Sequence, residues 1–146
     1  MAKKVREILD KKGHTFWYVA PDNTVFEALK IMAEKQIGAL MVVNDNKLVG
    51  IFSERDYARK IILQGLTSKV AKVSEIMTHN VIFVNPDRDV DECMALMTEK
   101  HIRHLPVLEG DAIVGLISIG DVVNAYIQQQ HITISDLENY IYGGKM

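Results

Sequence analysis

Apolar and polar residues alternate along this chain in a pattern that occurs twice. In residues 37–56, an apolar strand, the turn residues Asn44-Asp-Asn46 and a second apolar strand precede a helix start at Ser53. Residues 102–121 repeat this pattern. At a constant spacing of 65 residues, the stretches 19–58 and 84–123 share 15 identities in 40 aligned positions, without a gap. This agreement indicates an internal duplication.

The pattern predicts the same order of elements in each copy. A first strand, at 16–20 or 81–84, ends at a Pro-Asp pair and is followed by a helix that opens with a capping-box sequence. A strand hairpin and a second helix, at 54–63 or 119–130, complete the copy. In the order β-α-β-β-α the first two strands should be parallel and the last two antiparallel. We therefore expect a mixed α/β (α+β) fold of two pseudo-symmetric repeats packed sheet to sheet.

The same comparison suggests the domain boundaries. Residues 5–9 (VREIL) echo residues 73–77 (VSEIM) at a spacing of 68, so the first copy carries three extra residues before its first strand. We expect the first repeat over 1–68, the second over 69–130, and a tail over 131–146 with a short helix of its own. That helix would form a dimer contact or pack on its own chain. Its apolar face consists of Leu137, Tyr140 and Ile141.

Composition narrows the function classes only slightly. The chain has a net charge of -2 and a pI near 6.2, so it has no global positive field to attract nucleic acid. No apolar run approaches the roughly 20 residues of a membrane span, and the N-terminal stretch 1–13 is too charged for a signal peptide. The one cysteine, Cys93, cannot form an intramolecular disulfide. We expect a cytoplasmic protein without a membrane or nucleic-acid partner.

Each copy ends its last strand with Ser-x-x-Asp at the start of a helix. The two motifs are Ser53 to Asp56 and Ser118 to Asp121. Such a motif is commonly only a capping box. Alternatively, the serine hydroxyl and free backbone amides face a polar ligand while the carboxylate accepts hydrogen bonds from a ribose diol. A duplicated cap would repeat as well, so repetition alone does not choose between them.

Further residues give the chain a specific resemblance. It carries Val-x-x-Ile-Met at 73–77, the strand start THNVIFV at 78–84, the strand HLPV at 104–107 and Gly-Leu-Ile-Ser-x-x-Asp at 115–121. In these motifs the chain resembles a tandem pair of CBS domains, also called a Bateman module, over about residues 5–128. The resemblance implies a regulatory sensor of adenosine-containing ligands such as AMP, ADP, ATP, S-adenosylmethionine or NAD(H), bound between the repeats. It leaves the preferred nucleotide and a role for Mg²⁺ undecided.

The resemblance also implies two sets of site residues. Those carried over to the second site are Thr78, Asn80, Val81, Ile82, His104, Pro106, Ser118 and Asp121. Those carried over to the first site are Gly13, Thr15, Phe16, Trp17, Met41, Ser53 and Asp56. Trp17 would either line the adenine pocket or fill the core.

The copies differ where a phosphate would bind. The second copy has RHLP at 103–106 where the first has GALM at 38–41, whereas only the first helix start carries Arg55 and Arg59. Arginine suits the geometry of a phosphate, so we infer two inequivalent sites. The alternatives are an exposed strand-end charge for Arg103 and solvated helix positions for Arg55 and Arg59. The best phosphate candidates are Arg59, Arg103 and His104.

An enzyme is the weakest interpretation. The stretch 115–121 lacks the Lys and Ser/Thr of a phosphate loop, and no G-x-G-x-x-G occurs. His101-x-x-His104 has no further Cys or His nearby in sequence to complete a metal site. Together with the resemblance, which implies a sensor, this leads us to expect a non-catalytic homodimer that reports ligand occupancy to a separate, unidentified protein. The rival is a ligand-independent adaptor that binds a partner enzyme or redox protein through its dimer surface.

Overall fold

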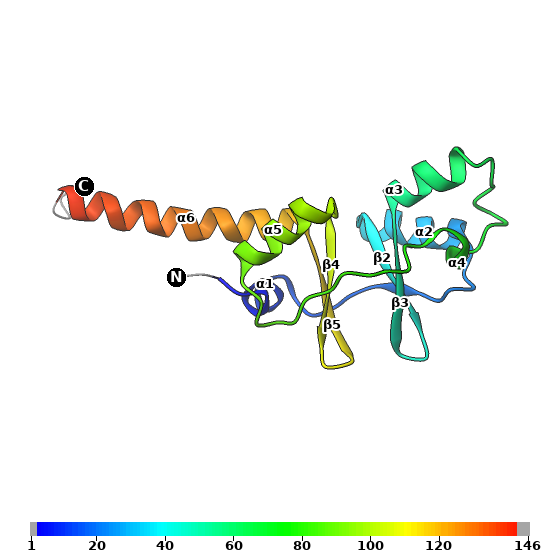
Figure 1. Ribbon diagram of the computed structural model, residues 1–146, viewed down its shortest axis with the longest axis horizontal. Coiled ribbons are helices and arrows are strands. Elements are labelled where there is room, and N and C mark those ends of the chain that lie inside the picture. The colour runs from blue at the N-terminus through cyan, green and yellow to red at the C-terminus, as the bar shows by residue number, and fades with distance from the viewer. Residues whose placement is uncertain (1–2, 143–146) are drawn as a thin grey trace.

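The computed structural model, which describes residues 3–142, contains two copies of one arrangement side by side (Figure 1). The first copy consists of β1 (Tyr18–Val19), α2 (Val25–Lys35), β2 (Ala39–Asn44), β3 (Lys47–Ser53), α3 (Glu54–Asp56) and its π-helical continuation η1 (Tyr57–Ile62). The second consists of α5 (Val90–Lys100), β4 (His104–Glu109), β5 (Ala112–Ser118) and α6 (Ile119–Tyr142). A short helix precedes each copy: α1 (Val5–Lys12) and α4 (Val73–Ile76). The expected two-repeat α/β architecture is confirmed.

The first copy forms a three-stranded sheet in the order β1-β2-β3. β1 is parallel to β2, and β2 is antiparallel to β3, as expected. The hairpin loop consists of Asp45 and Asn46, both at positive φ (51° and 62°). Two consecutive residues in this conformation form the turn that matches the twist of a tight hairpin, and Asp and Asn tolerate it well.

The predicted first strand of the second copy, 81–84, is wrong. Within residues 3–142 the second sheet contains only β4 and β5. Val84 alone pairs with β4. Its N–H donates to the Pro106 carbonyl at 3.0 Å, and its carbonyl accepts the N–H of Leu108 at 2.9 Å. The preceding parallel rung would need an N–H at position 106 to reach the carbonyl of Ile82, and proline has none. The first copy has Met41 at this position, and there β1 pairs over two residues.

Each lead helix packs on the other copy. Val5 of α1 belongs to the buried core of α5, β4, β5 and α6, whereas Val73 of α4 belongs to the core of α2, β2 and β3. We call this arrangement, in which the helix that precedes one copy packs on the other copy, the exchange of lead helices. Equivalent backbone hydrogen bonds accompany it in both places. The N–H of Val5 donates to the Arg88 carbonyl at 2.9 Å, and the N–H of Val73 donates to the Asn23 carbonyl at 2.8 Å. Neither copy therefore has a complete core without residues from beyond its own strands and helices.

In the last strand of each copy, a glycine lies directly against the lead helix or the residues that follow it. A Cβ built on Gly50 would lie 2.5 Å from Sδ of Met77 and 3.1 Å from the carbonyl oxygen of Thr78. A Cβ on Gly115 would lie 2.6 Å from Cδ2 of Leu9. Any larger residue would collide with the helix that the exchange brings there. This close approach explains why both copies carry glycine at this position.

The expected short, separate tail helix is also wrong. α6 is one continuous helix of 24 residues, and it extends well beyond the rest of the molecule in Figure 1. Residues 121–142 contain neither Gly nor Pro, so nothing in the backbone forces a break, and Ser135 lies inside the helix. Neither α6 nor any other helix of the described residues is long and apolar enough to cross a membrane. The predicted helix end at Gly143 and Gly144 lies outside the described residues, as do the side chains of Leu137, Tyr140 and Ile141.

We expect Gly115→Ala to lower the free energy of unfolding by about 1–3 kcal/mol, because the new methyl group would overpack the contact with Leu9. Urea unfolding measures this change. Gly120→Ala is the control, because Gly120 is exposed and its nearest neighbour to a new Cβ is Oγ of Ser118 at 3.6 Å. Equal losses in the two variants would contradict the close packing of α1 on Gly115.

Candidate functional site

A cavity of about 490 Å³ lies between the two copies. Its walls come from the end of β3 and the start of α3 and η1, from the segment after α4, and from the turn between α5 and β4. Its size is within the range of about 300–1,000 Å³ typical of small-molecule sites. The lining residues are Gly38, Ile51, Ser53, Glu54, Arg55, Asp56, Arg59, Lys60, Thr78, Asn80, Val81, Ile82, His101, Ile102, Arg103, His104 and Ile119.

Ser53 and Asp56 form a capping box at one end of this cavity. Oγ of Ser53 accepts the N–H of Asp56 at 3.3 Å, and Oδ2 of Asp56 accepts the N–H of Ser53 at 3.0 Å. The other carboxylate oxygen, Oδ1, lies 3.3 Å from Nζ of Lys60 and 3.5 Å from Oγ1 of Thr78. One oxygen of Asp56 therefore caps the helix, and the other is shared among residues that line the cavity.

Thr78 reaches Asp56 because the chain after α4 pairs with β3. The N–H of Thr78 donates to the Ile51 carbonyl at 2.9 Å, and the N–H of Ile51 donates back to the Thr78 carbonyl at 3.1 Å. This bridge begins directly after Met77, the residue that packs on Gly50. The exchange of lead helices thus carries the start of the second repeat to the Ser-x-x-Asp motif of the first.

Positive charge dominates the cavity lining. Four Lys or Arg side chains face two acidic ones, Glu54 and Asp56. The guanidinium Nη1 of Arg55 also lies 3.4 Å from the carbonyl oxygen of His101, so this side chain joins the two copies. An anionic group would find charge-assisted donors from both repeats here. The four cations are Arg55, Arg59, Lys60 and Arg103.

The pKa of His104, a residue of the cavity lining, is displaced from its ordinary value. The ring is half-buried, and the space above it is provided by Gly38, where a Cβ would lie 3.5 Å from the ring atoms. Burial lowers the pKa of His104, and the positive charges of Lys12 and Arg103 lower it further, while Asp121 opposes them. The imidazole is therefore neutral at pH 7 and can accept or donate a hydrogen bond.

Ser118 and Asp121 do not line the larger cavity with the segment 78–82, contrary to the grouping expected from sequence. Oδ2 of Asp121 accepts Nζ of Lys12 at 2.7 Å and the N–H of Ser118 at 2.8 Å. Asp121 lines a different cavity, of about 290 Å³, between α1 and α6. The reason is again the exchange, because α4 delivers the segment after it to the first copy while α1 delivers Lys12 to the second.

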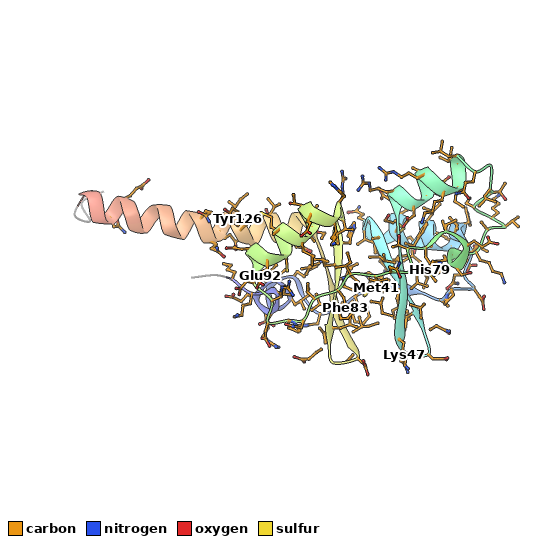
Figure 2. The ribbon with its side chains drawn as sticks, in the orientation of Figure 1. Met41, Lys47, His79, Phe83, Glu92 and Tyr126 are labelled. Carbon is orange, nitrogen blue, oxygen red and sulfur yellow. The ribbon has the colours of Figure 1, made fainter. Side chains whose placement is uncertain are left out.

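Met41 and Pro106, expected at the entry of the second strand in each site, do not line the larger cavity. Both are buried, and Met41 lies near the centre of the molecule in Figure 2. They occupy equivalent positions on β2 and β4, where both side chains are part of the buried interior. Figure 2 also shows His79 and Phe83 on the segment that passes between the copies, and Phe83 is exposed.

The segment 15–17 lies away from the larger cavity. Trp17 neither fills the core nor lines that cavity. Its ring is 41% exposed, and Nζ of Lys35 lies 4.2 Å from the ring centroid in a cation–π contact. Phe16 is half-buried, with its ring centroid 6.1 Å from that of Tyr18, and Thr15 is exposed. The candidates of the first predicted site are thus divided between this segment and the Ser53–Asp56 motif.

Comparison with known sequences decides the family. Residues 5–63 and 73–128 each match the sequence profile of the CBS domain. The chain belongs to the CBS-domain family. A curated relative of this CBS-domain protein is the CBS domain-containing protein CBSX3, mitochondrial, of Arabidopsis thaliana, which is 40% identical over 149 aligned residues, covering 96% of this chain and 72% of the relative.

Solved structures agree with this assignment. A protein with CBS domains from Burkholderia ambifaria MC40-6 shares 50% sequence identity with this CBS-domain protein and superposes with a TM-score of 0.84 over 88% of this chain and 96% of that chain. The CBS domain pair of protein MJ0100, solved in complex with 5′-methylthioadenosine and S-adenosyl-L-methionine, has 29% identity and a TM-score of 0.75 over 88% of this chain and 99% of that chain.

Sequence reasoning missed several lining residues of this CBS-domain protein. Lys60 could have been found, because it follows Asp56 by four residues and such pairs meet on one helix face. Gly38 could have been noticed as the small residue that stands where the second copy has Arg103. The remaining lining residues are not themselves part of a recognisable binding motif. They are Ile51, Glu54, His101, Ile102 and Ile119.

The lowered pKa of His104 predicts a pH-dependent stability. The unfolded chain binds a proton near the ordinary histidine pKa of about 6.5, whereas the folded protein does so only at lower pH. The folded state is therefore favoured above about pH 6.5 and loses this advantage as the pH falls through the folded-state pKa. We expect His104→Gln to lose less Tm than the wild type between about pH 7.5 and 5.5. An equal loss, measured by calorimetry without ligand, would contradict this assignment.

Proposed function

We propose that this CBS-domain protein is a regulatory module that binds an adenine nucleotide, AMP, ADP or ATP, in the cavity between its copies. The observation that carries the proposal is the carboxylate of Asp56 at one end of a cavity of about 490 Å³ with a cationic lining. NAD(H) is the alternative ligand, and a requirement for Mg²⁺ is decided by the same experiment. Occupancy would reach a separate protein by favouring one of two conformations.

Asp56 is suited to a ribose. Its contact with Oγ1 of Thr78 is 3.5 Å, which is long for a hydrogen bond and therefore easily replaced, and a ribose would share the same oxygen with Nζ of Lys60 at 3.3 Å. A ribose diol offers two O–H donors to Oδ1, while Oδ2 stays on the N–H of Ser53. Binding would thus keep the capping box of α3 intact.

The remaining lining is suited to the base and the phosphates. Val81, Ile82 and Ile102 offer apolar surface for adenine, and Arg59 and Arg103 offer planar guanidinium groups for phosphate. The relative MJ0100 was solved with two adenosine-containing ligands, which supports the ligand class. The four cations of the present cavity favour phosphorylated nucleotides over S-adenosylmethionine, which carries a positive sulfonium.

The proposal contains no chemical step. Oγ of Ser53 and Oγ1 of Thr78, the hydroxyl oxygens of the lining, both contact Asp56, and we assign this carboxylate the role of a hydrogen-bond acceptor for the ligand. We also propose a cytoplasmic location, with which the single buried Cys93 is compatible because the chain needs no disulfide.

We also propose that the chain forms a homodimer through α6. Val123 and Ile127 lie four residues apart on this helix and are 37% and 48% exposed, and the helix extends beyond the rest of the molecule (Figure 1). Pairing with a second copy would cover this apolar stripe. Light scattering should then give twice the chain mass of 16.5 kDa. A monomeric mass at micromolar concentration would contradict the dimer.

Calorimetric titration with AMP, ADP, ATP, NAD⁺, NADH and S-adenosylmethionine, with and without Mg²⁺, tests the ligand. We expect Asp56→Ala to weaken nucleotide binding by about 10- to 100-fold, because hydrogen bonds to a charged group contribute about 1.5–3 kcal/mol. Asp121→Ala is the matched control, since it removes the equivalent carboxylate and the equivalent bond to a serine N–H. We expect it to retain binding.

The outcomes separate the two functions considered from sequence. Nucleotide binding that depends on Asp56 and not on Asp121 supports the sensor. Normal binding by a folded Asp56→Ala protein would overturn this site. If the wild type binds none of these ligands, the ligand-independent adaptor is favoured instead, and the search moves to bound proteins.

A further inference from the structure

His104 presents the edge of its imidazole ring to the cavity between the copies. A Cβ built on Gly38, another lining residue, would lie 3.5 Å from both Cε1 and Nε2 of the ring. The Nε2 edge is therefore directed toward the first copy. Among the described residues 3–142, neither ring nitrogen has a hydrogen-bond partner. A ligand in the cavity can thus use Nε2 without displacing a protein group.

The duplication places an imidazole at this position in the second copy only. His104 begins β4 and is paired with Ser118 of β5. Its counterpart at the spacing of 65 residues is Ala39, which begins β2 and is fully buried. The residue before Ala39 is Gly38, which adds no side chain to the space beside the ring. The ring edge and the space that it faces therefore come from different copies.

Charged groups surround His104 from several elements. Lys12 of α1 and Arg103 of the turn before β4 disfavour a positive ring, whereas Asp121 of α6 favours one. The other ionisable side chains of the cavity lining are Glu54, Arg55, Asp56, Arg59, Lys60 and His101. Lysines and arginines outnumber carboxylates in this combined set by five to three. A further positive charge on the ring is therefore disfavoured before a ligand binds.

A phosphate group would reverse this balance. Burial lowers the pKa of His104 most, and the charges of Lys12 and Arg103 lower it further, so the ring is neutral at pH 7 before a ligand binds. A phosphate is negative, and a nearby opposite charge favours the charged form of a histidine. The protonated ring would then donate an N–H to a phosphate oxygen in a charge-assisted hydrogen bond.

Proton uptake follows from this change. A group whose pKa is higher in the complex than in the free protein takes up a proton as the ligand binds. The affinity then increases as the pH falls from the pKa of the complex to the pKa of the free protein. At still lower pH the ring is charged in both states, so the affinity gains nothing more from it.

We propose that His104 takes up a proton when the phosphate of a nucleotide enters the cavity, so that binding strengthens as the pH falls from about 8 to 6. This inference rests on the proposed function for the identity of the ligand. Its structural basis is the Nε2 edge of the ring in a cavity whose cations come from both copies.

Calorimetric titration with AMP and ATP near pH 6.5, in PIPES and in Bis-Tris, tests the proposal, because the two buffers have different ionisation enthalpies. The difference in heat gives the number of protons taken up per nucleotide bound. We expect the wild type to take up more protons than His104→Gln, which cannot be protonated. Between about pH 8 and 6 we expect the affinity of the wild type to rise about tenfold more than that of His104→Gln. The comparison with the variant accounts for titration of the nucleotide's own phosphate.

His101→Gln is the matched control, and we expect it to keep the proton uptake of the wild type. His101 lines the same cavity but is exposed, and it contacts Arg55 through its backbone carbonyl. Glutamine fits this position, because the counterpart Gln36 has the same φ of 56°. His104→Lys is a second variant that carries a fixed charge, and its binding should depend on pH no more than that of His104→Gln. Circular dichroism checks that each variant is folded.

The outcomes distinguish this inference from the proposed function. Proton uptake that is lost in a folded His104 variant and kept in His101→Gln supports the inference. Nucleotide binding with equal proton uptake in the wild type and the His104 variants would overturn it and leave the nucleotide site intact. Loss of the uptake in His101→Gln alone would assign the proton to His101 and overturn the inference as well. No nucleotide binding by the wild type at any pH between about 6 and 8 would overturn both.

Discussion

The reciprocal contact between each lead helix and a strand glycine of the other copy determines most of this structure. Leu9 packs on Gly115 and Met77 packs on Gly50, at distances that admit no Cβ. Interiors packed to this density transmit a change of position to everything attached. The segment that follows each lead helix is therefore held against the last strand of the opposite copy. The larger cavity is built on one of these two segments.

The same contact allows two equal copies to have unequal sites. After α4 the chain continues directly into Thr78, which pairs with Ile51 and reaches Asp56. After Leu9 the helix continues to Lys12 and places an ammonium group on Asp121 instead. A difference of one helical turn thus gives the two Ser-x-x-Asp motifs different lysine partners, although their capping geometry is similar. Asp56 is paired with Lys60 of its own helix, and Asp121 is paired with Lys12 of α1.

Much of the fold could be predicted because it depends on local patterns. The duplication, the hairpins, the Asp45-Asn46 turn and the capping boxes all have signatures within a few residues. The missing strand near Val84 was predictable in principle, because Pro106 lacks the N–H that the ladder requires. That Asp121 and Thr78 line different cavities could not be predicted, for a different reason. In a duplicated sequence, Leu9 and Met77 suit either glycine equally well, so the pattern does not reveal that the helices are exchanged.

The exchange also orders events during synthesis. α1 is made first, but its buried partners lie in residues 84–125, so its apolar face stays without a core until the second copy has been translated. The first copy likewise waits for Val73 and Ile76 of α4 to complete its core. Contacts so distant in sequence slow folding and leave apolar surface exposed meanwhile. The two repeats therefore have to fold together as one cooperative unit, although the duplicated sequence pattern suggests two separate units.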